Sequence, residues 1–443
     1  MASDAPIAHD ARWPVTSLRD ITTKVGSGAT PKGGADVYLP TRTSFALVRS
    51  QNVYDRRFEP YGLAFITNEQ AAELRGVVLQ ANDILLNITG DGVTFGRACM
   101  VPTDVLPACV NQHVSIIRVD PQYADAGYVL AFLTHPEVKP YIESFNAGGS
   151  RRAITKGHIE SFRVPLPPLH MQRKIASILG ALDDKIELNR RMSQTLESMA
   201  RALFESWFVD FDPVRAKAGG RDPSLPSPLA DLLPDSFEDS EAGEVPKGWR
   251  LFGLDEIADF LNGLALQRFP ANDGQALPVI KIAQLHAGNT EGADEASAGI
   301  PSDYVVQDGD VLFSWSGSLS VELWCGGPGA LNQHLFKVTS RLFPKWFYYH
   351  WTRQHLVDFS EIAAGKATTM GHIQRHHLSD AKVVVPPAAV LEAVDSVCGP
   401  VTEESWRIRV QSRDLAAIRD SLLPVLLAGS MDVDSTIESA VCL

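Results

Sequence analysis

The sequence predicts an α/β (α+β) fold in which a mixed module of helices and strands occurs twice, each copy followed by a long helix. Three observations support this prediction. The chain has 443 residues, which is more than one hydrophobic core usually serves. Matching strings recur in the same order in its two halves, and each half ends in an apolar repeat of seven residues. We therefore expect a pseudo-two-fold internal repeat, with the two helices paired as an antiparallel coiled coil.

Four pairs of strings define the repeated module. The pairs are "WPVTSLRDITTKVGSG" (from Trp13) with "WRLFGLDEIADFLNG" (Trp249), "NDILLNITGDG" (Asn82) with "GDVLFSWSGSL" (Gly309), "VNQHVSI" (Val110) with "LNQHLFK" (Leu331), and "TKGHIESFRVPLPPL" (Thr155) with "TMGHIQRHHLSDAKVVVPPAAV" (Thr369). Their order places the first module at 1–165 and the second at 246–385.

Short strands should make up much of each module. The runs "SFALVRSQNVY", "DILLNIT", "HVSIIRV" and "LPVIKIAQL" are rich in residues that favour strands. The stretch "AGYVLAFLTHPEVKPYI" predicts a helix among them. Both modules are therefore expected to be of mixed α/β type.

A long helix should follow each module, the first over 166–212 and the second over 386–430. The first contains Ile175, Leu182, Asn189, Leu196 and Leu203 at seven-residue spacing, with Ile178, Met192 and Met199 between them. The second contains Val394, Val401, Ile408, Leu415 and Leu422, supported by Leu391 and Ile418. Such spacing predicts the apolar seam of a coiled coil. A helix from Met171 to Phe208 would be about 55 Å long.

Two positions in these helices depart from an apolar seam. Asn189 at a seam position is expected to fix the register of the helix pair at some cost in stability. Gly399 and Pro400 should weaken or kink the second helix without ending it. The segment 213–245 is rich in Pro, Gly and Ser, with mostly acidic charges, so we expect a linker there, and a tail over 431–443.

Composition excludes several classes of protein. Apolar residues make up 45% and charged residues 21% of the chain, and no apolar run approaches the length of a membrane span. The first residues lack the apolar core of a signal peptide. The five cysteines are scattered and never form CxxC, which is typical of neither a disulfide framework nor a zinc knuckle. A cytoplasmic protein with no membrane association is expected.

The charge of the chain weighs against strong binding of nucleic acid by this chain alone. The formal net charge is -13, and phosphate neutralisation requires Lys and Arg. Much of the excess lies in 210–245, which contains nine acidic and three basic residues. Because no segment of the chain is strongly basic, DNA binding would need basic partner proteins.

The long helices carry a resemblance to a known family. The string "PLPPLHMQRKIASILGALDDKIELNRRMSQTLESMARALFESWFVDFDPVRAK" (165–217) closely resembles the central conserved region of the specificity subunits of type I restriction-modification enzymes. "IRDSLLPVLLAGSM" (418–431) resembles the distal conserved region, and "GEVPKGWR" (243–250) the usual start of the second module. The likeness covers nearly the whole chain.

This resemblance implies a function. Each module would be a target-recognition domain that reads one half of a bipartite site in double-stranded DNA, and the helices would set the spacer between the half-sites. The subunit would not be a catalyst and would bind no cofactor. It would recruit two modification subunits, which methylate adenine N6 with S-adenosylmethionine, and possibly two restriction subunits, which use ATP and Mg²⁺. The flipped adenine would then lie in the partner's pocket.

The residues themselves fit a non-catalytic role. "AAGKATT" (363–369) lacks the spacing of a phosphate-binding loop. "VDFDPV", around Asp210 and Asp212, lacks the second proline of the amino-group methyltransferase signature. The remaining clusters have simpler readings: His372, His376 and His377 as polar residues near a domain edge rather than metal ligands, and Asp183 and Asp184 as solvated charges rather than an acid/base pair.

The duplication gives a criterion for base readout. Modules that read different half-sites must differ where they contact bases, so residues shared by both are expected to be structural or to contact the DNA backbone. This applies to Asn111, Gln112 and His113, which recur as Asn332, Gln333 and His334, and to Gly157-His158-Ile159, which recurs as Gly371-His372-Ile373.

Divergent polar loops are the better candidates for DNA binding, because their side chains suit base edges or phosphates. In the first module the candidates are Thr30, Lys32, Gln51, Asn52, Arg56, Arg57, Asn87, Thr89, Asp91, Arg151, Arg152 and Lys156. In the second they are Gln267, Arg268, Lys281, Gln284, His286, Ser314, Ser316, Ser318, Lys366, Thr368 and Thr369. The alternative for any one of them is an ordinary exposed loop residue, since loops are polar in general.

The aromatic end of the first helix suggests a contact surface. Trp207, Phe208 and Phe211 are residues of the type that dominate protein interfaces, and we expect them to dock the modification subunits or to cap the helix pair. Two other functions remain open at this point: an autonomous methyltransferase or nuclease, which the missing motifs oppose, and a coiled-coil scaffold or adaptor without DNA readout.

Overall fold

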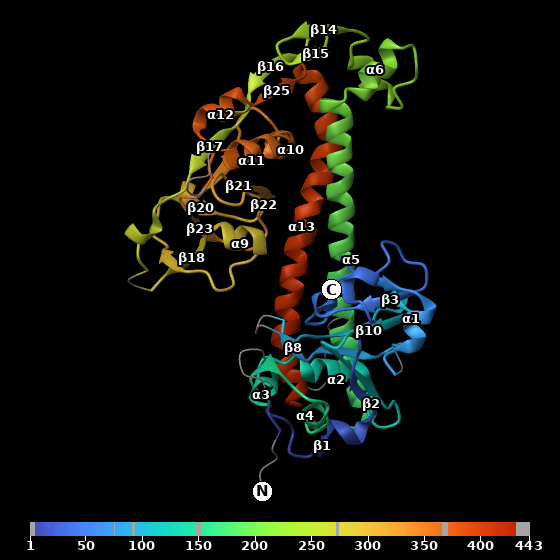
Figure 1. The fold of residues 1–443 in the computed structure, drawn as a ribbon. Coiled ribbons are helices and arrows are strands. Elements are labelled where there is room, and N and C mark those ends of the chain that lie inside the picture. Colours follow the sequence, from blue (N-terminus) through green and yellow to red (C-terminus); the bar gives the residue numbers. More distant parts are fainter. Residues whose placement is uncertain are drawn as a thin grey trace. The chain divides into compact units, whose positions relative to one another are not determined.

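The computed structural model describes residues 5–74, 76–90, 94–146, 152–271, 274–365 and 371–430. The chain divides into two units, one of Met1–Glu187 with Leu415–Leu443 and the other of Leu188–Asp414 (Figure 1). The two long helices, α5 (Leu169–Phe204) and α13 (Ala388–Leu427), each contribute one part to each unit. In the described residues no helix is long and apolar enough to cross a membrane.

The first unit contains the first module. Its strands are β1 (Val15–Ser17), β2 (Thr22–Ser27), β3 (Phe45–Val48), β4 (Val53–Tyr54), β5 (Arg57–Phe58), β6 (Ala64–Ile66), β7 (Ile84–Asn87), β8 (Thr89–Gly90), β9 (Ala98–Met100), β10 (Ala108–Val110), β11 (Val114–Val119), β12 (Arg152–Ala153) and β13 (Arg163–Pro165). Its helices are α1 (Asn68–Glu73), α2 (Ala126–Leu133), α3 (Val138–Ser144) and α4 (Lys156–Glu160).

An antiparallel sheet in the order β2-β11-β7-β9 forms the centre of this module. The first four residues of β11 and all of β7 are buried, because the sheet is covered on both faces. A smaller sheet, β10-β3-β6, has one parallel and one antiparallel pair. Residues of α2, α5 and α13 complete one hydrophobic core of the unit, including Ile175, Leu179 and Leu426.

The second unit contains the second module. Its strands are β14 (Phe237–Ser240), β15 (Gly243–Pro246), β16 (Arg250–Gly253), β17 (Asp259–Asn262), β18 (Ala276–Ile280), β19 (Glu295–Ser297), β20 (Val305–Val306), β21 (Val311–Ser314), β22 (Ser320–Leu323), β23 (Gly329–Leu331), β24 (Leu335–Thr339) and β25 (Lys382–Val385). Its helices are α6 (Asp212–Ala218), α7 (Ser227–Leu232), α8 (Leu254–Ile257), α9 (Ile282–Ala287), α10 (Lys345–Gln354), α11 (Leu356–Gly365) and α12 (Arg375–Asp380).

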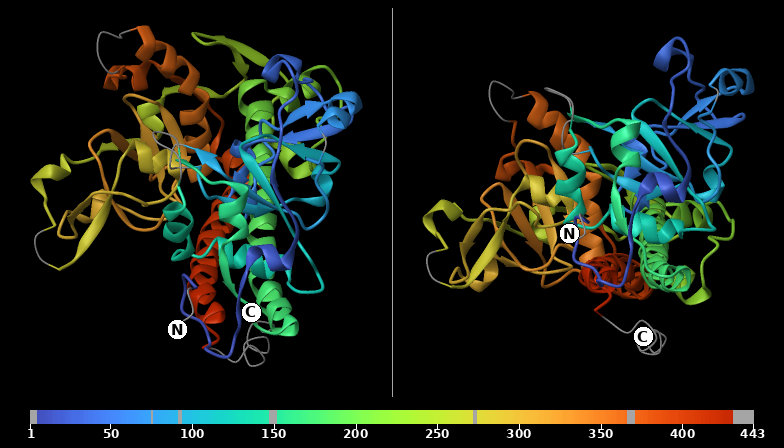
Figure 2. Two further views of the ribbon diagram at one scale, coloured as in Figure 1. Left: turned by 60° about the horizontal axis from the view of Figure 1, so that its bottom comes forward. Right: turned by 90° about the horizontal axis from the view of Figure 1, so that it is seen from below.

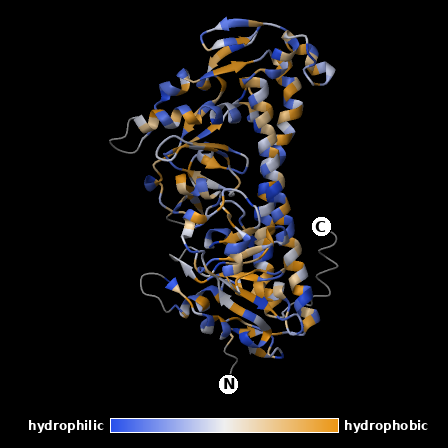
Figure 3. Ribbon diagram, turned by 45° about the vertical axis from the view of Figure 1, so that its right-hand side comes forward, coloured by the Kyte–Doolittle hydropathy of each residue, from blue (hydrophilic) through white to orange (hydrophobic). Residues whose placement is uncertain are grey.

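The second module repeats the topology of the first. Its central sheet has the order β17-β24-β21-β22, and a parallel pair, β18 with β23, corresponds to β3 with β10. A matched ion pair joins the central strands: Asp83 binds Arg118 at 2.7 Å and Asp310 binds Lys337 at 2.8 Å. Figure 3 shows largely hydrophobic strands in both modules. The predicted internal repeat of mixed α/β modules is confirmed.

The long helices pair antiparallel, as their contacts within the second unit show. Asn189 Nδ2 donates to Gln411 Oε1 at 2.8 Å, and Ser193 Oγ donates to the Ser405 carbonyl at 2.9 Å, so later residues of α5 meet earlier residues of α13. Both views in Figure 2 show the two helices side by side. Asn189 is buried at a seam position, as predicted. The hydrogen bond between the side-chain amides of Asn189 and Gln411 favours the one register in which these two residues meet.

Part of the second line of predicted seam residues is wrong, whereas Ile178 and Leu391 do pack in the hydrophobic cores. Met192 and Met199 are 40% and 50% exposed, and Ile418 is 47% exposed. The buried residues of α5 instead follow the seven-residue positions by four, as Leu179 and Ala200 do. Because spacings of three and four are both close to one helical turn, the sequence repeat alone did not distinguish the two sides.

Three predicted elements differ in the structure. The helix predicted from "AGYVLAFLTHPEVKPYI" is two helices, α2 and α3, because Pro136 cannot continue a helix from the preceding turn. Part of "LPVIKIAQL" is the helix α9, in which the Gln284 side chain caps the Lys281 N–H. The expected linker at 213–245 carries α6, α7 and the hairpin of β14 and β15.

The expected exposure of the aromatic helix end is also wrong. After α5 the chain makes one π turn, Glu205–Val209, and Phe211 adopts a left-handed conformation with φ 56°. These two irregularities turn the aromatic residues inward. Phe208 is 1% and Phe211 6% exposed, and Trp207 is half-buried.

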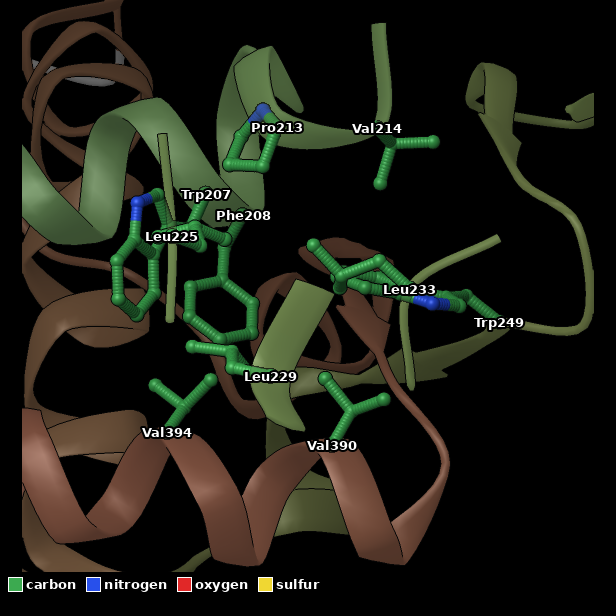
Figure 4. Close-up of a pocket in the computed structure, with 10 residues that line it drawn as sticks. All are labelled: Trp207, Phe208, Pro213, Val214, Leu225, Leu229, Leu233, Trp249, Val390 and Val394. Carbon is green, nitrogen blue, oxygen red and sulfur yellow. The ribbon is translucent and has the colours of Figure 1, made fainter. Parts of the chain in front are cut away.

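Phe208 lies in the hydrophobic core of the second unit. Its ring centroid is 5.5 Å from those of Trp346 and Phe347, and 5.8 Å from that of Trp249. Figure 4 shows Phe208 facing Leu229 above α13. Phe208 and Phe211 therefore stabilise this chain's own module and cannot serve as exposed docking residues in this arrangement.

A buried histidine in this core predicts a pH dependence of stability. His350 stacks on Phe204 with centroids 5.2 Å apart, and burial lowers the pKa of its imidazole from 6.5 to about 3. Between these values only the unfolded chain takes up the proton, so stability is full above pH 6.5 and falls as the pH drops. At pH 5 the expected loss is about 2 kcal/mol relative to pH 7. Thermal denaturation at both pH values checks this, and His350→Gln should reduce the difference.

Candidate nucleic-acid interface

One edge of the central sheet gathers polar side chains in the first module. The end of β2, the start of β11 and the end of β7 meet there. Thr30 Oγ1 donates to Gln112 Oε1, and Thr89 Oγ1 lies 2.6 Å from His113 Nδ1. Asn111 Oδ1 accepts the His113 N–H at 3.0 Å. We name Thr30, Thr89, Gln112 and His113 the first polar edge.

The second module has the same arrangement. Ser316 Oγ lies 3.0 Å from His334 Nδ1, and Asn332 Oδ1 accepts the His334 N–H at 3.2 Å. Gln333 Nε2 is 3.3 Å from His334 Nε2, as Gln112 Nε2 is 3.4 Å from its own neighbouring histidine. These matched bonds fit the structural role expected for the shared Asn-Gln-His trio. We name Ser316, Gln333 and His334 the second polar edge.

The structural counterpart of His158 differs from the one expected. His158 Nδ1 accepts the Thr155 N–H at 3.4 Å in the cap of α4. His377 Nδ1 accepts the Gln374 N–H at 3.0 Å in the equivalent cap of α12. His377 therefore corresponds to His158, and the match of His158 to His372 by sequence string is wrong.

Several predicted DNA contacts are buried. Asn52 Nδ2 donates to the Glu59 carbonyl at 2.8 Å, and Asn87 Nδ2 donates to the Ser50 carbonyl at 3.0 Å. Ser314 Oγ donates to the Ser318 carbonyl at 2.6 Å. The exposed fraction of Asn52, Asn87 and Ser314 is 0%. These side chains hold loops in place and do not reach DNA in this conformation.

Other candidates are exposed or partly exposed. The exposed side chains are Lys32, Gln51, Lys156, Gln267, Arg268, His286 and Ser318, and the partly exposed ones are Thr30, Arg57, Thr89, Arg152, Lys281 and Gln284. Ser316 is nearly buried at the second polar edge. Four of the basic residues are already paired with a carboxylate: Arg57 with Glu59, Arg152 with Glu143, Lys156 with Glu160 and Lys281 with Asp294. Asp91, Arg151, Lys366, Thr368 and Thr369 lie outside the described residues.

Arg56 and Asp183 have roles that the sequence did not predict. The Arg56 side chain is only 5% exposed and binds Asp183 through Nε at 2.8 Å and Nη2 at 2.5 Å. Asp183 also accepts Arg419 Nη1 at 2.9 Å. Arg56 is thus not free to read bases, and Asp183 is not a solvated charge.

Sequence reasoning missed an arginine pair beside the first polar edge. The guanidinium carbons of Arg57 and Arg97 lie 4.4 and 4.5 Å from the ring centroid of Tyr54. We name these three residues the arginine-tyrosine cluster. Asn87, at the end of β7, donates its N–H to the Arg97 carbonyl at 2.9 Å. Stacking orients guanidinium groups and leaves their N–H edges available to phosphate or guanine. Nothing in the string around Arg97 indicates that it meets Tyr54.

The second module has an aromatic residue, Trp315, beside its polar edge, at the position that Ile88 holds in the first module. Trp315 follows β21, its Nε1 donates to Asn262 Oδ1 at 3.0 Å, and its ring lies 6.1 Å from that of His334. Only the serines of this "SWSGS" string were predicted to bind DNA. The loop carries chemistry quite unlike the arginine-tyrosine cluster.

The described residues show no site for a metal. No group of three or more His, Cys, Asp or Glu side chains in the described parts of the chain could hold an ion. Cys99, Cys109, Cys325 and Cys398 are buried free thiols. The polar edges therefore offer hydrogen bonds, guanidinium groups and aromatic faces as their chemistry.

Comparison with known proteins shows which family this chain resembles. Residues 13–198 match the family model described as "Type I restriction modification DNA specificity domain". The MjaIX specificity subunit of Methanocaldococcus jannaschii is 24% identical over 436 residues, which cover 95% of this chain and 94% of that subunit. Over nearly its whole length, this chain is thus similar to a type I restriction specificity subunit. The resemblance stated from the helices is confirmed.

Other type I restriction specificity subunits are similar to this chain in sequence or in fold. The HindI specificity subunit of Haemophilus influenzae is 23% identical over 385 residues, covering 76% of this chain and 84% of that subunit. The crystal structure of a type I restriction-modification S subunit from M. genitalium covers 96% of this chain and 98% of its own. With 12% identity and a TM-score of 0.57, that specificity subunit supports the same fold.

Proposed function

We propose that this specificity subunit directs a type I restriction-modification enzyme to a bipartite sequence in double-stranded DNA. The observation that carries the proposal is the pair of modules with one shared scaffold and different side chains at the same edge. The first polar edge adjoins Arg57 and Arg97, and the second adjoins Trp315. Two modules with the same topology but different side chains at the polar edge are suited to binding two different half-sites.

The available side chains suit readout in the major groove. Guanidinium groups pair with O6 and N7 of guanine, and amides such as that of Gln51 pair with N6 and N7 of adenine. Exposed basic residues, among them Lys32 and Arg268, suit phosphates. The net charge of -13 implies that basic partner subunits supply much of the non-specific affinity.

The chemical step would belong to the partners. We infer that two modification subunits bring S-adenosylmethionine and methylate adenine, and that restriction subunits, where present, bring ATP and Mg²⁺. This chain would bind none of these cofactors. Its own contribution would be selection of the sequence and of the spacer, as a non-catalytic subunit in the cytoplasm.

A modification subunit would dock on the outer face of α5 in the second unit. Leu188, Met192 and Met199 are 56%, 40% and 50% exposed and lie along one face of that helix. Exposed apolar stripes of this kind mark contact surfaces. This stripe takes the docking role that was one of the two roles expected for Trp207, Phe208 and Phe211, the other being to cap the helix pair.

Methylation mapping tests the proposed function. The chain is expressed with its modification partner in a host without other adenine methylation, and modified adenines are mapped across the genome. A two-part motif with a fixed gap is expected. Absence of new methylation from a complex that assembles would contradict DNA readout and favour a scaffold.

The arginine-tyrosine cluster gives a second expectation. Arg97→Met should weaken DNA binding by the assembled complex and reduce the slope of log affinity against log salt by about 1 if Arg97 contacts one phosphate. Measuring binding at several salt concentrations checks this. Arg341→Met, at an exposed position of the second module, serves as the control and should leave the slope unchanged. An unchanged slope and affinity for Arg97→Met would show that the arginine-tyrosine cluster does not contact the DNA.

A further inference from the structure

We propose that Arg56, Asp183 and Arg419 form an ion-pair lock that seats the first module on the long helices and thereby fixes the spacer of the DNA target. The inference rests on the proposed function and deepens it. It assigns a positioning role to Arg56, which sequence reasoning had placed among the DNA contacts.

The lock joins three distant segments within the first unit. Arg56 lies in the turn between β4 and β5, Asp183 on α5, and Arg419 on α13. Asp183 Oδ2 accepts both Nε and Nη2 of Arg56, and its Oδ1 accepts Nη1 of Arg419 at 2.9 Å. One carboxylate therefore connects the module with both helices.

Burial makes this cluster more than a surface ion pair. The exposed fractions of the Arg56, Asp183 and Arg419 side chains are 5%, 18% and 17%. Solvent screens buried pairs weakly, and a guanidinium that binds a carboxylate through two N–H groups has a defined direction. Arg56 Nη1 also donates to Thr134 Oγ1 at 3.3 Å, which leaves little freedom to its side chain.

The backbone of Arg56 points to the same role. Its φ is 57°, in the left-handed region where Gly or Asn would be less costly than Arg. Asp55 holds the turn from the other side, because its Oδ1 accepts Lys139 Nζ at 2.6 Å. An arginine kept in an unfavourable conformation implies that its side chain has a function there.

The position of the lock along α5 explains what it adds. The module already packs on the start of α5, where Ile175 and Leu179 belong to its core and Gln172 Oε1 accepts the Asp125 N–H at 2.9 Å. Asp183 lies four residues beyond Leu179, or about 6 Å further along the helix. A second attachment at that distance prevents the module from rocking about the first.

The second unit has a separate attachment of opposite polarity. Arg413 on α13 donates through Nη1 to both carboxylate oxygens of Asp308 at 2.9 Å and to the Cys325 carbonyl at 2.9 Å. Here the arginine is on the helix and the carboxylate on the module. Each module thus has its own ion pair with a long helix, so the lock of the first module can be tested alone.

Two substitutions test the lock in the assembled modification complex. Arg56→Gly removes the guanidinium while suiting the left-handed backbone, and Asp183→Asn removes the charge from the helix side. For both, methylation at sites whose spacer is one base pair longer or shorter should rise about tenfold relative to the preferred spacer, which corresponds to about 1.4 kcal/mol. The half-site sequences should stay the same. Arg19→Met, which breaks the exposed Arg19–Glu160 pair of the same unit, should change neither.

Hydrogen exchange of the full chain provides a readout that does not depend on DNA. Amides of the β4–β5 turn should exchange faster in Arg56→Gly and in Asp183→Asn than in the parent and in Arg19→Met. An unchanged spacer profile with unchanged exchange would overturn the lock. Faster exchange with an unchanged spacer would show that the ion pair stabilises the module but does not set the spacer, which contradicts the proposal. A changed first half-site would contradict it too, because Arg56 would then contact bases. If the parent methylates no bipartite motif, the proposed function fails, while the exchange result still decides whether the lock exists.

Discussion

Phe208→Ala is expected to lower the free energy of unfolding of the second unit by about 3 to 5 kcal/mol, which is the usual cost of truncating a fully buried phenylalanine. The reason is the set of rings around it: Trp249, Trp346 and Phe347 would lose their common neighbour and enclose a cavity. Chemical denaturation followed by tryptophan fluorescence measures the effect, since two of these neighbours are tryptophans.

A matched substitution in α5, which precedes Phe208, separates folding from docking. Met199→Glu lies on the exposed stripe of α5, so it should leave the unfolding free energy within about 0.5 kcal/mol of the parent. The same change should weaken binding of the modification subunit, because it places a charge in an apolar contact. A folded Phe208→Ala variant with normal stability and impaired docking would restore the helix end as the contact surface.

Inserting the same number of residues into α5 and α13 at positions that face each other should lengthen the spacer of the DNA target. Four residues inserted after Asn189 and four after Gln411, which face each other in the seam, add about 6 Å to each helix. This length corresponds to about one or two base-pair steps. Four residues are close to one helical turn, so the seam rotates by only about 40°. Methylation mapping should show unchanged half-sites with a longer gap.

The control for this experiment is an insertion away from the helices. Four residues placed after Gly220, an exposed position between α6 and α7, should leave the gap as it is. A double insertion in α5 and α13 that still supports methylation with the original spacer would contradict the role of the helices as a ruler. An insertion that changed the half-sites would instead indicate that the modules had been distorted.

The architecture could be predicted because its signals are repeated. Trp13 and Trp249 begin equivalent strings, and the seven-residue spacing around Asn189 appears again around Ile408. A signal that occurs twice in the same order is rarely accidental. The second line of the seam could not be predicted, because spacings of three and four residues are equally compatible with one turn of helix.

The burial and the binding partners of single polar side chains were much harder to predict. Arg56 and Arg57 are neighbours in one string, yet the first is buried against Asp183 and the second is stacked on Tyr54. Their difference arises from partners distant in sequence, about which the local string says nothing. The prediction for Phe208 was wrong for a related reason, since Phe208 lies within the π turn Glu205–Val209, which the local string does not indicate.

The composition of the first unit has a consequence for synthesis on the ribosome. Its core contains Leu423, Leu426 and Leu427, which come from the last helix described. The module that emerges first therefore lacks part of its core until the rest of the chain has been translated. Contacts so distant in sequence slow folding and leave apolar surface exposed in the meantime. Nascent chains arrested before α13 should therefore bind chaperones through the first module, although that module is by then fully synthesised.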